Sequence, residues 1–330
     1  MSRLFTCLAV AVLLGFVFAE RSRAAASLDP ARPPGGNFDL SHWYLTIPDS
    51  SASRISPADL VAGYTNNPWF YTGTNGAMVF WCPVTGGTTS NSSYPRSELR
   101  ERLDPTTDTV NWTAYGTHIL DAQCKVTQVP SSGKVIIGQI HSFIGKANPL
   151  VKLQYANGLL DALVKDSPNA STDTHYVFST VGLNDLITYQ IKLVDGLLSI
   201  TVNGMTQTAN VFQSDPDWAN QTFYFKAGSY CQDNSGSVTE GSRVEFYFLK
   251  VRHTFLLDTP RSMVLAPVGA GKTAMTLTAI QHALATHAAK RFLVLAPKRV
   301  VTDVWPVEAP KWAPKLTLAV ACGSPDARLA

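Results

Sequence analysis

Residues 224–232 read YFKAGSYCQ, and the alternation of polar and apolar side chains in this stretch indicates the fold class. In an extended strand, side chains two positions apart point to the same face. Phe225 and Ala227 therefore share an apolar face, whereas Lys226 and Tyr230 share a polar one. The pattern is typical of a strand that packs one face on a core and leaves the other face open. The stretch therefore predicts a β-sheet with one functional face.

Strand-like runs of the same kind fill the chain on both sides of that stretch, from residue 37 to residue 253. Clusters of Gly, Asn, Asp, Ser and Pro separate them, and Asp195-Gly196 and Asn203-Gly204 are typical of hairpin turns. No long segment in this range has a sustained helical period. Short strands separated by turn residues predict an all-β sandwich or jelly roll. The expected strands are Ala77–Cys82, Thr117–Val126, Val135–Ser142, Leu150–Tyr155, Thr174–Val181, Ile187–Leu193, Leu197–Val202, Thr222–Tyr230 and Ser242–Val251.

Two further segments place polar, titratable groups at alternate positions. These groups are Arg96, Glu98 and Arg100 in the first segment, and Gln139 and His141 in the second. Taken singly, each pattern has an ordinary structural explanation, such as a surface ion-pair ladder or a hydrogen-bonded sheet histidine. Together with the polar face of residues 224–232, they gather groups that can bind acidic sugars and move protons.

In order and spacing, the three segments resemble those of polysaccharide lyase family 7, the alginate lyases. The matching motifs are RSELR at 96–100, QIH at 139–141 and YFKAGSYCQ at 224–232, and the resemblance covers about residues 37–253. One departure is Cys231, where Asn is frequent in the family, and this side chain belongs to the apolar face. The resemblance implies a jelly roll with a concave substrate groove and β-elimination between uronate units, without a metal or another cofactor.

The family's chemistry explains the residue types. The resemblance implies that Arg96 and Gln139 neutralise the substrate carboxylate and stabilise the enolate-like intermediate. His141 would be a neutral base, which suits its reference pKa of about 6.5. Tyr230 would protonate the leaving O4, or remove the C5 proton in the other epimer. The expected substrate-binding residues are Glu98, Arg100, Lys226 and Gln232, and Glu98 would orient Arg96 or Arg100.

Composition and charge limit the partners. The chain has 330 residues, of which 45% are hydrophobic and 15% charged, and its formal net charge is +3. This charge is too small to predict a nucleic-acid or membrane partner. An acidic polysaccharide such as alginate would have to be attracted by a local cluster of cations. We expect a monomer.

The N-terminal residues 1–26 are typical of a secretory signal peptide and its processing region. Arg3 precedes an apolar run from Leu4 to Phe18, which is shorter than the roughly 20 residues that a membrane span needs. The Pro- and Gly-rich residues 27–36 predict a linker. We therefore expect a secreted protein that leaves the membrane once the signal is cut. An exported chain can form disulfides, but the sequence leaves open one bridge or free thiols among Cys82, Cys124 and Cys231.

The residue composition and its pattern change near Thr254. Residues 263–267 and 292–297 are apolar strand-like runs, and residues 274–289 have a helical composition, so 254–330 predicts a partial α/β appendage. The loop between them resembles the phosphate loop of superfamily 2 helicases, although Ala266 replaces its first Gly. Its matching residues are Gly269, Gly271, Lys272 and Thr273. No acidic magnesium-binding strand or second motor domain follows, so we expect a vestigial fragment without useful ATP hydrolysis.

Two alternatives to a lyase remain open from the sequence. A jelly roll can bind an acidic polysaccharide without cutting it, and the appendage could belong to a nucleotide-dependent motor. We expect a lyase that acts within the polymer, although loops that close the groove ends would decide this. Ile140 between Gln139 and His141 accompanies guluronate acceptance in the resembled family. We therefore expect guluronate-containing blocks to be cleaved.

Overall fold

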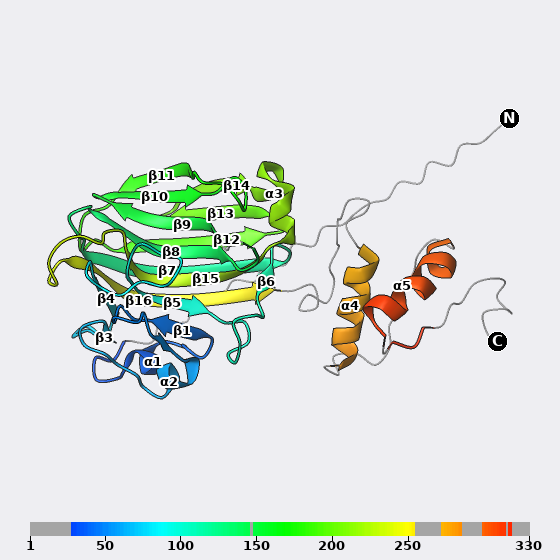
Figure 1. Ribbon diagram of the computed structural model, residues 1–330, viewed down its shortest axis with the longest axis horizontal. Helices are drawn as coiled ribbons and strands as arrows, with labels where there is room; N and C mark the ends of the chain where they lie inside the picture. Colours follow the sequence, from blue (N-terminus) through cyan, green and yellow to red (C-terminus); the bar gives the residue numbers. More distant parts are fainter. Residues whose placement is uncertain (1–27, 146–147, 255–271, 286–298, 315, 319–330) are drawn as a thin grey trace.

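The computed structural model describes residues 28–145, 148–254, 272–285, 299–314 and 316–318. Two antiparallel β-sheets dominate these residues (Figure 1). The predicted all-β jelly-roll sandwich is confirmed. The predicted signal peptide, the glycines of the phosphate loop and the strand-like runs at 263–267 and 292–297 lie outside the described residues.

The first sheet contains nine strands in the order β11-β10-β9-β8-β15-β5-β1-β2, with β6 paired to β15. They are β1 Trp43–Thr46, β2 Arg54–Ile55, β5 Arg96–Glu101, β6 Trp112–Thr113, β8 Lys134–Ser142, β9 Pro149–Ala156, β10 Leu159–Val164, β11 Thr174–Thr180 and β15 Thr222–Cys231.

The second sheet contains seven strands in the order β14-β13-β12-β7-β16-β4-β3. They are β3 Phe70–Thr72, β4 Met78–Pro83, β7 Thr117–Gln128, β12 Ile187–Val194, β13 Leu197–Val202, β14 Met205–Asn210 and β16 Gly241–Thr254. Each of the nine runs expected from the sequence overlaps a strand. The β12–β13 and β13–β14 hairpins turn at Asp195-Gly196 and Asn203-Gly204, and all four residues have positive φ, as the sequence predicted.

The hydrophobic core lies between the two sheets. Strand β7 shows the reason, because its residues alternate between buried and partly exposed along nearly its whole length. Large fully buried side chains come from both sheets and their connections, including Trp112, Tyr189, Phe225 and Phe246. Burying each such side chain contributes about 1.5–3 kcal/mol. This core holds the nine-stranded sheet rigidly, so its other face, hereafter the outer face, can carry precisely placed polar groups.

Short helices complete the sandwich: α1 Pro34–Asn37, α2 Pro57–Val61, α3 Val211–Ser214 and η1 Pro216–Asn220. The stretch expected as a linker differs from that expectation where the structure describes it. Leu28 packs against the core, and Asn37 exchanges hydrogen bonds with Asp29. Apolar contact and satisfied polar groups therefore attach residues 28–37 to the sandwich.

The predicted helix of the appendage is present as α4 Lys272–Ala285. It is followed by η3 Val300–Val304 and α5 Trp305–Trp312. These helices have a small core of their own, which includes Leu277, Ile280 and Trp305. No helix among the described residues is long and apolar enough to cross a membrane. The thiols of Cys82, Cys124 and Cys231 are free and buried, so none of these three is bridged.

Candidate active site

Strand β15 brings the three sequence segments together because it pairs with β5 on one side and β8 on the other. Tyr230 lies opposite Arg96 on β5. Lys226 lies opposite both Arg100 on β5 and Gln139 on β8. Directly paired side chains project from the same face of a sheet. All these residues therefore share the outer face, which is the shared face that strand alternation predicted.

Glu98 is the centre of this group, and its side chain is only 1% exposed. Its carboxylate accepts hydrogen bonds from Arg96 Nη1 at 3.2 Å and from Gln139 Nε2 at 2.5 Å, and it forms an ion pair with Lys226. Two cations and one neutral donor thus surround one carboxylate. The cluster keeps a net positive charge, which favours an acidic ligand.

Arg96 is fixed on its other side by Tyr230 and Ser92. The guanidinium carbon lies 3.8 Å from the centre of the Tyr230 ring, and Nη2 donates to Ser92 Oγ at 2.8 Å. Ser92 Oγ is also 3.0 Å from the Tyr230 hydroxyl. A cation and a phenol that can donate a proton therefore lie side by side. Sequence reasoning missed Ser92, because a loop serine four residues before Arg96 gives no periodic signal.

His141 is held in one tautomer. Its Nδ1 lies 2.8 Å from the carbonyl oxygen of Ser142, and a carbonyl can only accept. Nδ1 therefore carries the proton, and Nε2 keeps a free lone pair. The Tyr224 ring stacks on the imidazole at a centroid distance of 5.3 Å, and its hydroxyl is 3.1 Å from Nδ1. Tyr224 could have been found from the sequence, because it shares the alternation of Lys226.

Burial and the nearby cation Lys226 lower the pKa of His141 to about 3. The imidazole is therefore neutral at neutral pH, as a base must be. Burial also lowers the pKa of Lys226 to about 8; Arg96 adds to this effect, and Glu98 opposes it. Lys226 thus stays mainly charged at neutral pH. The outer face therefore combines a neutral imidazole with cations that can bind a carboxylate.

Two residues expected to bind substrate are engaged elsewhere. Arg100 is 3% exposed, and its Nη2 donates to the carbonyl of Asp108 and to Asn111 Oδ1, both at 3.0 Å. Its guanidinium carbon lies 3.9 Å from the centre of the Tyr224 ring, so it supports the partner of His141. Gln232 follows the end of β15, and its amide donates back to the carbonyls of Tyr230 and Cys231.

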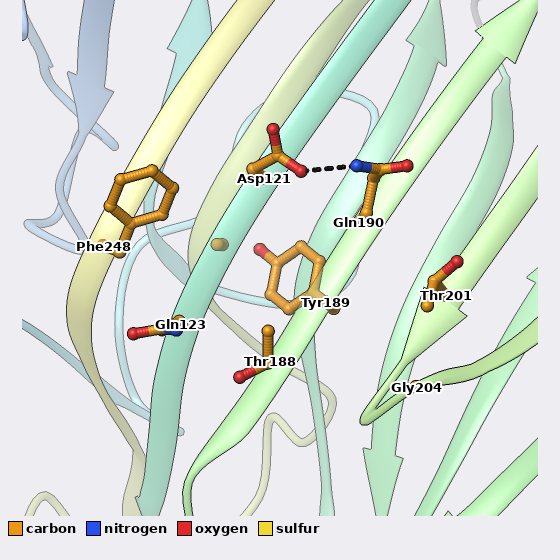
Figure 2. Close-up of a pocket in the computed structure, with 9 residues that line it drawn as sticks. Asp121, Gln123, Thr188, Tyr189, Gln190, Thr201, Gly204 and Phe248 are labelled. Carbon is orange, nitrogen blue, oxygen red and sulfur yellow. Dashed lines mark hydrogen bonds between the residues drawn. The ribbon is translucent and has the colours of Figure 1, made fainter. Parts of the chain in front are cut away.

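A depression of about 330 Å³ lies on the other sheet (Figure 2). Its lining residues come from β7, β12, β13, β16 and the turn between β13 and β14. They include Phe248 and Asp121, which accepts a hydrogen bond from Gln190 at 2.7 Å. None of the sequence-predicted site residues lines it. Among the described residues, no group of three or more His, Cys, Asp or Glu side chains could hold a metal ion.

Comparisons with known proteins relate the β-sandwich to alginate lyases. A family model described as alginate lyase matches residues 38–253. An alginate lyase of Klebsiella pneumoniae is 27% identical over 299 residues, which cover 72% of this chain and 95% of that protein. A 78-residue stretch is 47% identical to a putative protein p41 of Acyrthosiphon pisum secondary endosymbiont phage 1, covering 23% of this chain and 17% of that protein.

Solved structures extend the similarity. The alginate lyase A1-II', a member of polysaccharide lyase family 7, is 47% identical with a TM-score of 0.65, covering 68% of this chain and 99% of that chain. A variant of it in complex with the substrate GGMG is 44% identical with a TM-score of 0.66, covering 71% and 100% of the two chains. The alginate lyase PA1167 of Pseudomonas aeruginosa is 40% identical with a TM-score of 0.62, covering 66% and 100%.

Proposed function

The chain belongs to the alginate lyase family, and from this premise we propose that it is a secreted enzyme that cuts within alginate chains by β-elimination and accepts guluronate-containing blocks. The observation that carries the proposal is the grouping of a neutral His141 and of Tyr230 around the Arg96–Glu98 pair. A site that only bound the polymer would need the cations but would have no need of a neutral base. The family relationship and this grouping support the same chemistry.

In the proposed mechanism, Arg96 and Gln139 bind the carboxylate of the uronate that loses its C5 proton. The positive charge of Arg96 and the hydrogen bonds of both side chains stabilise the enolate-like intermediate that forms when this proton leaves. His141 takes this proton on Nε2, the nitrogen left free by the Ser142 contact. The C4–O4 bond then breaks, a C4–C5 double bond forms, and the Tyr230 hydroxyl donates its proton to O4. His141 then releases its extra proton to solvent, and Tyr230 takes up a proton from solvent, which restores the starting state of both side chains.

Incubation with alginate tests the proposal directly. Elimination creates a conjugated unsaturated uronate, whose ultraviolet absorbance rises with time, whereas binding or hydrolysis leaves no such product. A lyase that acts within the chain should also lower the viscosity of the polymer before many ends have formed. Binding without absorbance would favour the alternative of a non-catalytic acidic-polysaccharide-binding module.

The acceptance of guluronate is tested by substitution of the base. In guluronate, C5–H and O4 lie anti, which suits two separate groups such as His141 and Tyr230. In mannuronate they lie syn, so Tyr230 could serve as both base and acid. His141→Ala should therefore reduce initial rates on poly-guluronate by about 10²-fold or more, and reduce those on poly-mannuronate less. Equal losses on both polymers would remove the epimer-specific role of His141.

Ile140 supports the same preference indirectly, because it is fully buried between Gln139 and His141. Its size can shift the strand that carries both residues, and small displacements of a base change rates substantially. Secretion rests on the sequence pattern of residues 1–26, and analysis of the mature N-terminus in the culture medium would test it. We expect a monomer and no nucleotide chemistry from the appendage at 254–330.

A further inference from the structure

The outer face continues beyond the candidate active site, onto β9, β10 and β11 (Figure 1). Directly paired residues form a row from Gln139 on β8 to Lys152 on β9, then to Leu163 on β10 and His175 on β11. The neighbours Val151 and Leu153 are buried in the core, so Lys152 projects from the outer face. The row therefore extends the surface that carries Gln139 by three strands.

Two lysines share one carboxylate at this end of the face. Lys152 Nζ lies 2.8 Å from Asp173 Oδ2, and Lys165 Nζ lies 3.1 Å from Asp173 Oδ1. Only 20% of the Lys152 side chain, 9% of the Lys165 side chain and 16% of the Asp173 side chain are exposed. The three groups thus carry one excess positive charge in a largely buried setting, where a charge interacts strongly with a counter-ion.

The second feature of this region is a histidine–carboxylate pair. Nδ1 of His175, whose side chain is 60% exposed, lies 2.5 Å from Oδ2 of Asp161. Asp161 is directly paired with Gln154 on β9, so both belong to the row next to that of Lys152. The solvent-facing imidazole and the amide can form hydrogen bonds with sugar hydroxyls. The region therefore combines a cation pair for a carboxylate with polar groups that can bind hydroxyls.

We propose that Lys152 and Lys165, held by Asp173, form a distal uronate-binding subsite of the substrate surface. Neighbouring strands lie about 4.8 Å apart, which is close to the length of one sugar unit in an extended polymer. A uronate held at Arg96 and Gln139 therefore places the carboxylate of a following unit near Lys152. Each ammonium has three donors, so Lys152 can hold Asp173 and a substrate carboxylate together. This inference rests on the proposed lyase function.

Kinetics on size-defined oligoguluronates test the subsite. In the wild-type enzyme, kcat/KM should rise about tenfold once an oligomer is long enough to reach from Gln139 across β9. In Lys152→Gln the ratio of kcat/KM between long and short oligomers should fall about tenfold, mainly through KM. Lys165→Gln should act in the same direction. Lys192→Gln, on β12 of the other sheet, is the matched control and should keep the wild-type ratio.

Lys152→Arg separates substrate binding from a structural role, because it keeps the charge and should keep most of the length dependence. High salt should reduce the wild-type ratio more than the Lys152→Gln ratio. The subsite is disproved if Lys152→Gln keeps the wild-type ratio, or if Lys152→Arg loses it as fully as Lys152→Gln. If the wild type forms no unsaturated product from any uronate polymer, the lyase proposal fails instead. Calorimetric binding of long oligoguluronates to wild type and Lys152→Gln then tests the subsite alone.

Discussion

Two buried carboxylates on β5, three positions apart, have opposite surroundings. Glu98 on the outer face contacts Arg96, Lys226 and Gln139. Glu101 faces the core, where Trp112 Nε1 and the backbone N–H of Phe225 each donate to its Oε2 at 2.9 Å. Its Oε1 lies 2.5 Å from Nε2 of His253.

The inner network joins the two sheets. His253 Nδ1 is 2.8 Å from His118 Nδ1, and His118 Nε2 is 2.8 Å from the carbonyl of Tyr115. Because the carbonyl and the carboxylate only accept, each imidazole donates from its Nε2, and the two Nδ1 atoms share a third hydrogen bond. One strand thus uses a carboxylate for two purposes. Glu98 holds the cations of the outer face in place, whereas Glu101 holds the interior together.

The largest expected effect belongs to the outer face. Tyr230→Phe removes the hydroxyl that we propose protonates O4 but keeps the ring under Arg96, so kcat on alginate should fall by about 10³-fold or more. The melting temperature should change little, because the hydroxyl contacts only Ser92 among the described hydrogen bonds. Initial ultraviolet rates and thermal unfolding measure the two quantities. A variant that keeps a tenth of wild-type activity would show that another group protonates O4.

Glu98→Gln and Glu101→Gln form a matched pair that tests the comparison itself. Glu98→Gln should reduce kcat/KM about 10–100-fold, because Arg96 and Lys226 lose their common anchor. Glu101→Gln should cost about 3 kcal/mol of unfolding free energy, because Trp112, the backbone N–H of Phe225 and His253 lose a buried, charged acceptor. Its kcat, corrected for the folded fraction, should stay near the wild-type value. Urea unfolding and initial rates should therefore rank the two variants in opposite orders.

The inner face should also contribute to the acid stability, in addition to His141 on the outer face, whose pKa is lowered to about 3. Burial lowers the pKa of His118 to about 4, from an ordinary value of 6.5. Between these values the unfolded chain binds the proton more readily, so stability should fall as pH drops from about 6.5 to about 4, by up to about 3 kcal/mol. Urea unfolding at several pH values measures this slope. In His118→Gln the slope should become shallower, and an unchanged slope would assign the acid sensitivity to other groups.

The smallest effect is expected from removing residues 255–330. Strand β16 ends at Thr254, and the members of the sandwich core all precede that residue, while α4 and α5 have a separate core. Lyase activity should stay within about twofold, and the melting temperature of the sandwich within a few degrees. A large loss of soluble protein or activity on truncation would show that the appendage supports the sandwich.

Local alternation was enough to predict which side chains share a face, because it depends only on extended backbone geometry. Lys226 and Tyr230 could therefore be grouped on one strand from the sequence, and Arg96 and Glu98 on another. Strand β10, Leu159–Val164, escaped prediction, because residues 160–164 are all buried and its sequence does not alternate between apolar and polar residues.

Long-range pairing could not be predicted. A register shift between Ala227 and Tyr230 changes how β15 faces β8, and nothing local to either strand specifies it. The burial of Arg100 depends on a loop carbonyl at Asp108, far outside the strand pattern. The role of Glu98 was predicted only in part. It contacts Arg96 as expected, but its third partner, Gln139, comes from a strand that only the folded sheet brings near.

The central position of β15 has a consequence for folding. This strand lies far along the chain from both of its neighbours, so its pairings close long loops and are expected to form late. Arg96 and Tyr230 meet only through one of these pairings, and Gln139 and Lys226 through the other. During refolding from denaturant, compactness should therefore return before lyase activity. A chain that lacks residues 222–231 would keep most strands of the nine-stranded sheet. It would have none of the contacts across β15 that bring the candidate active-site residues together.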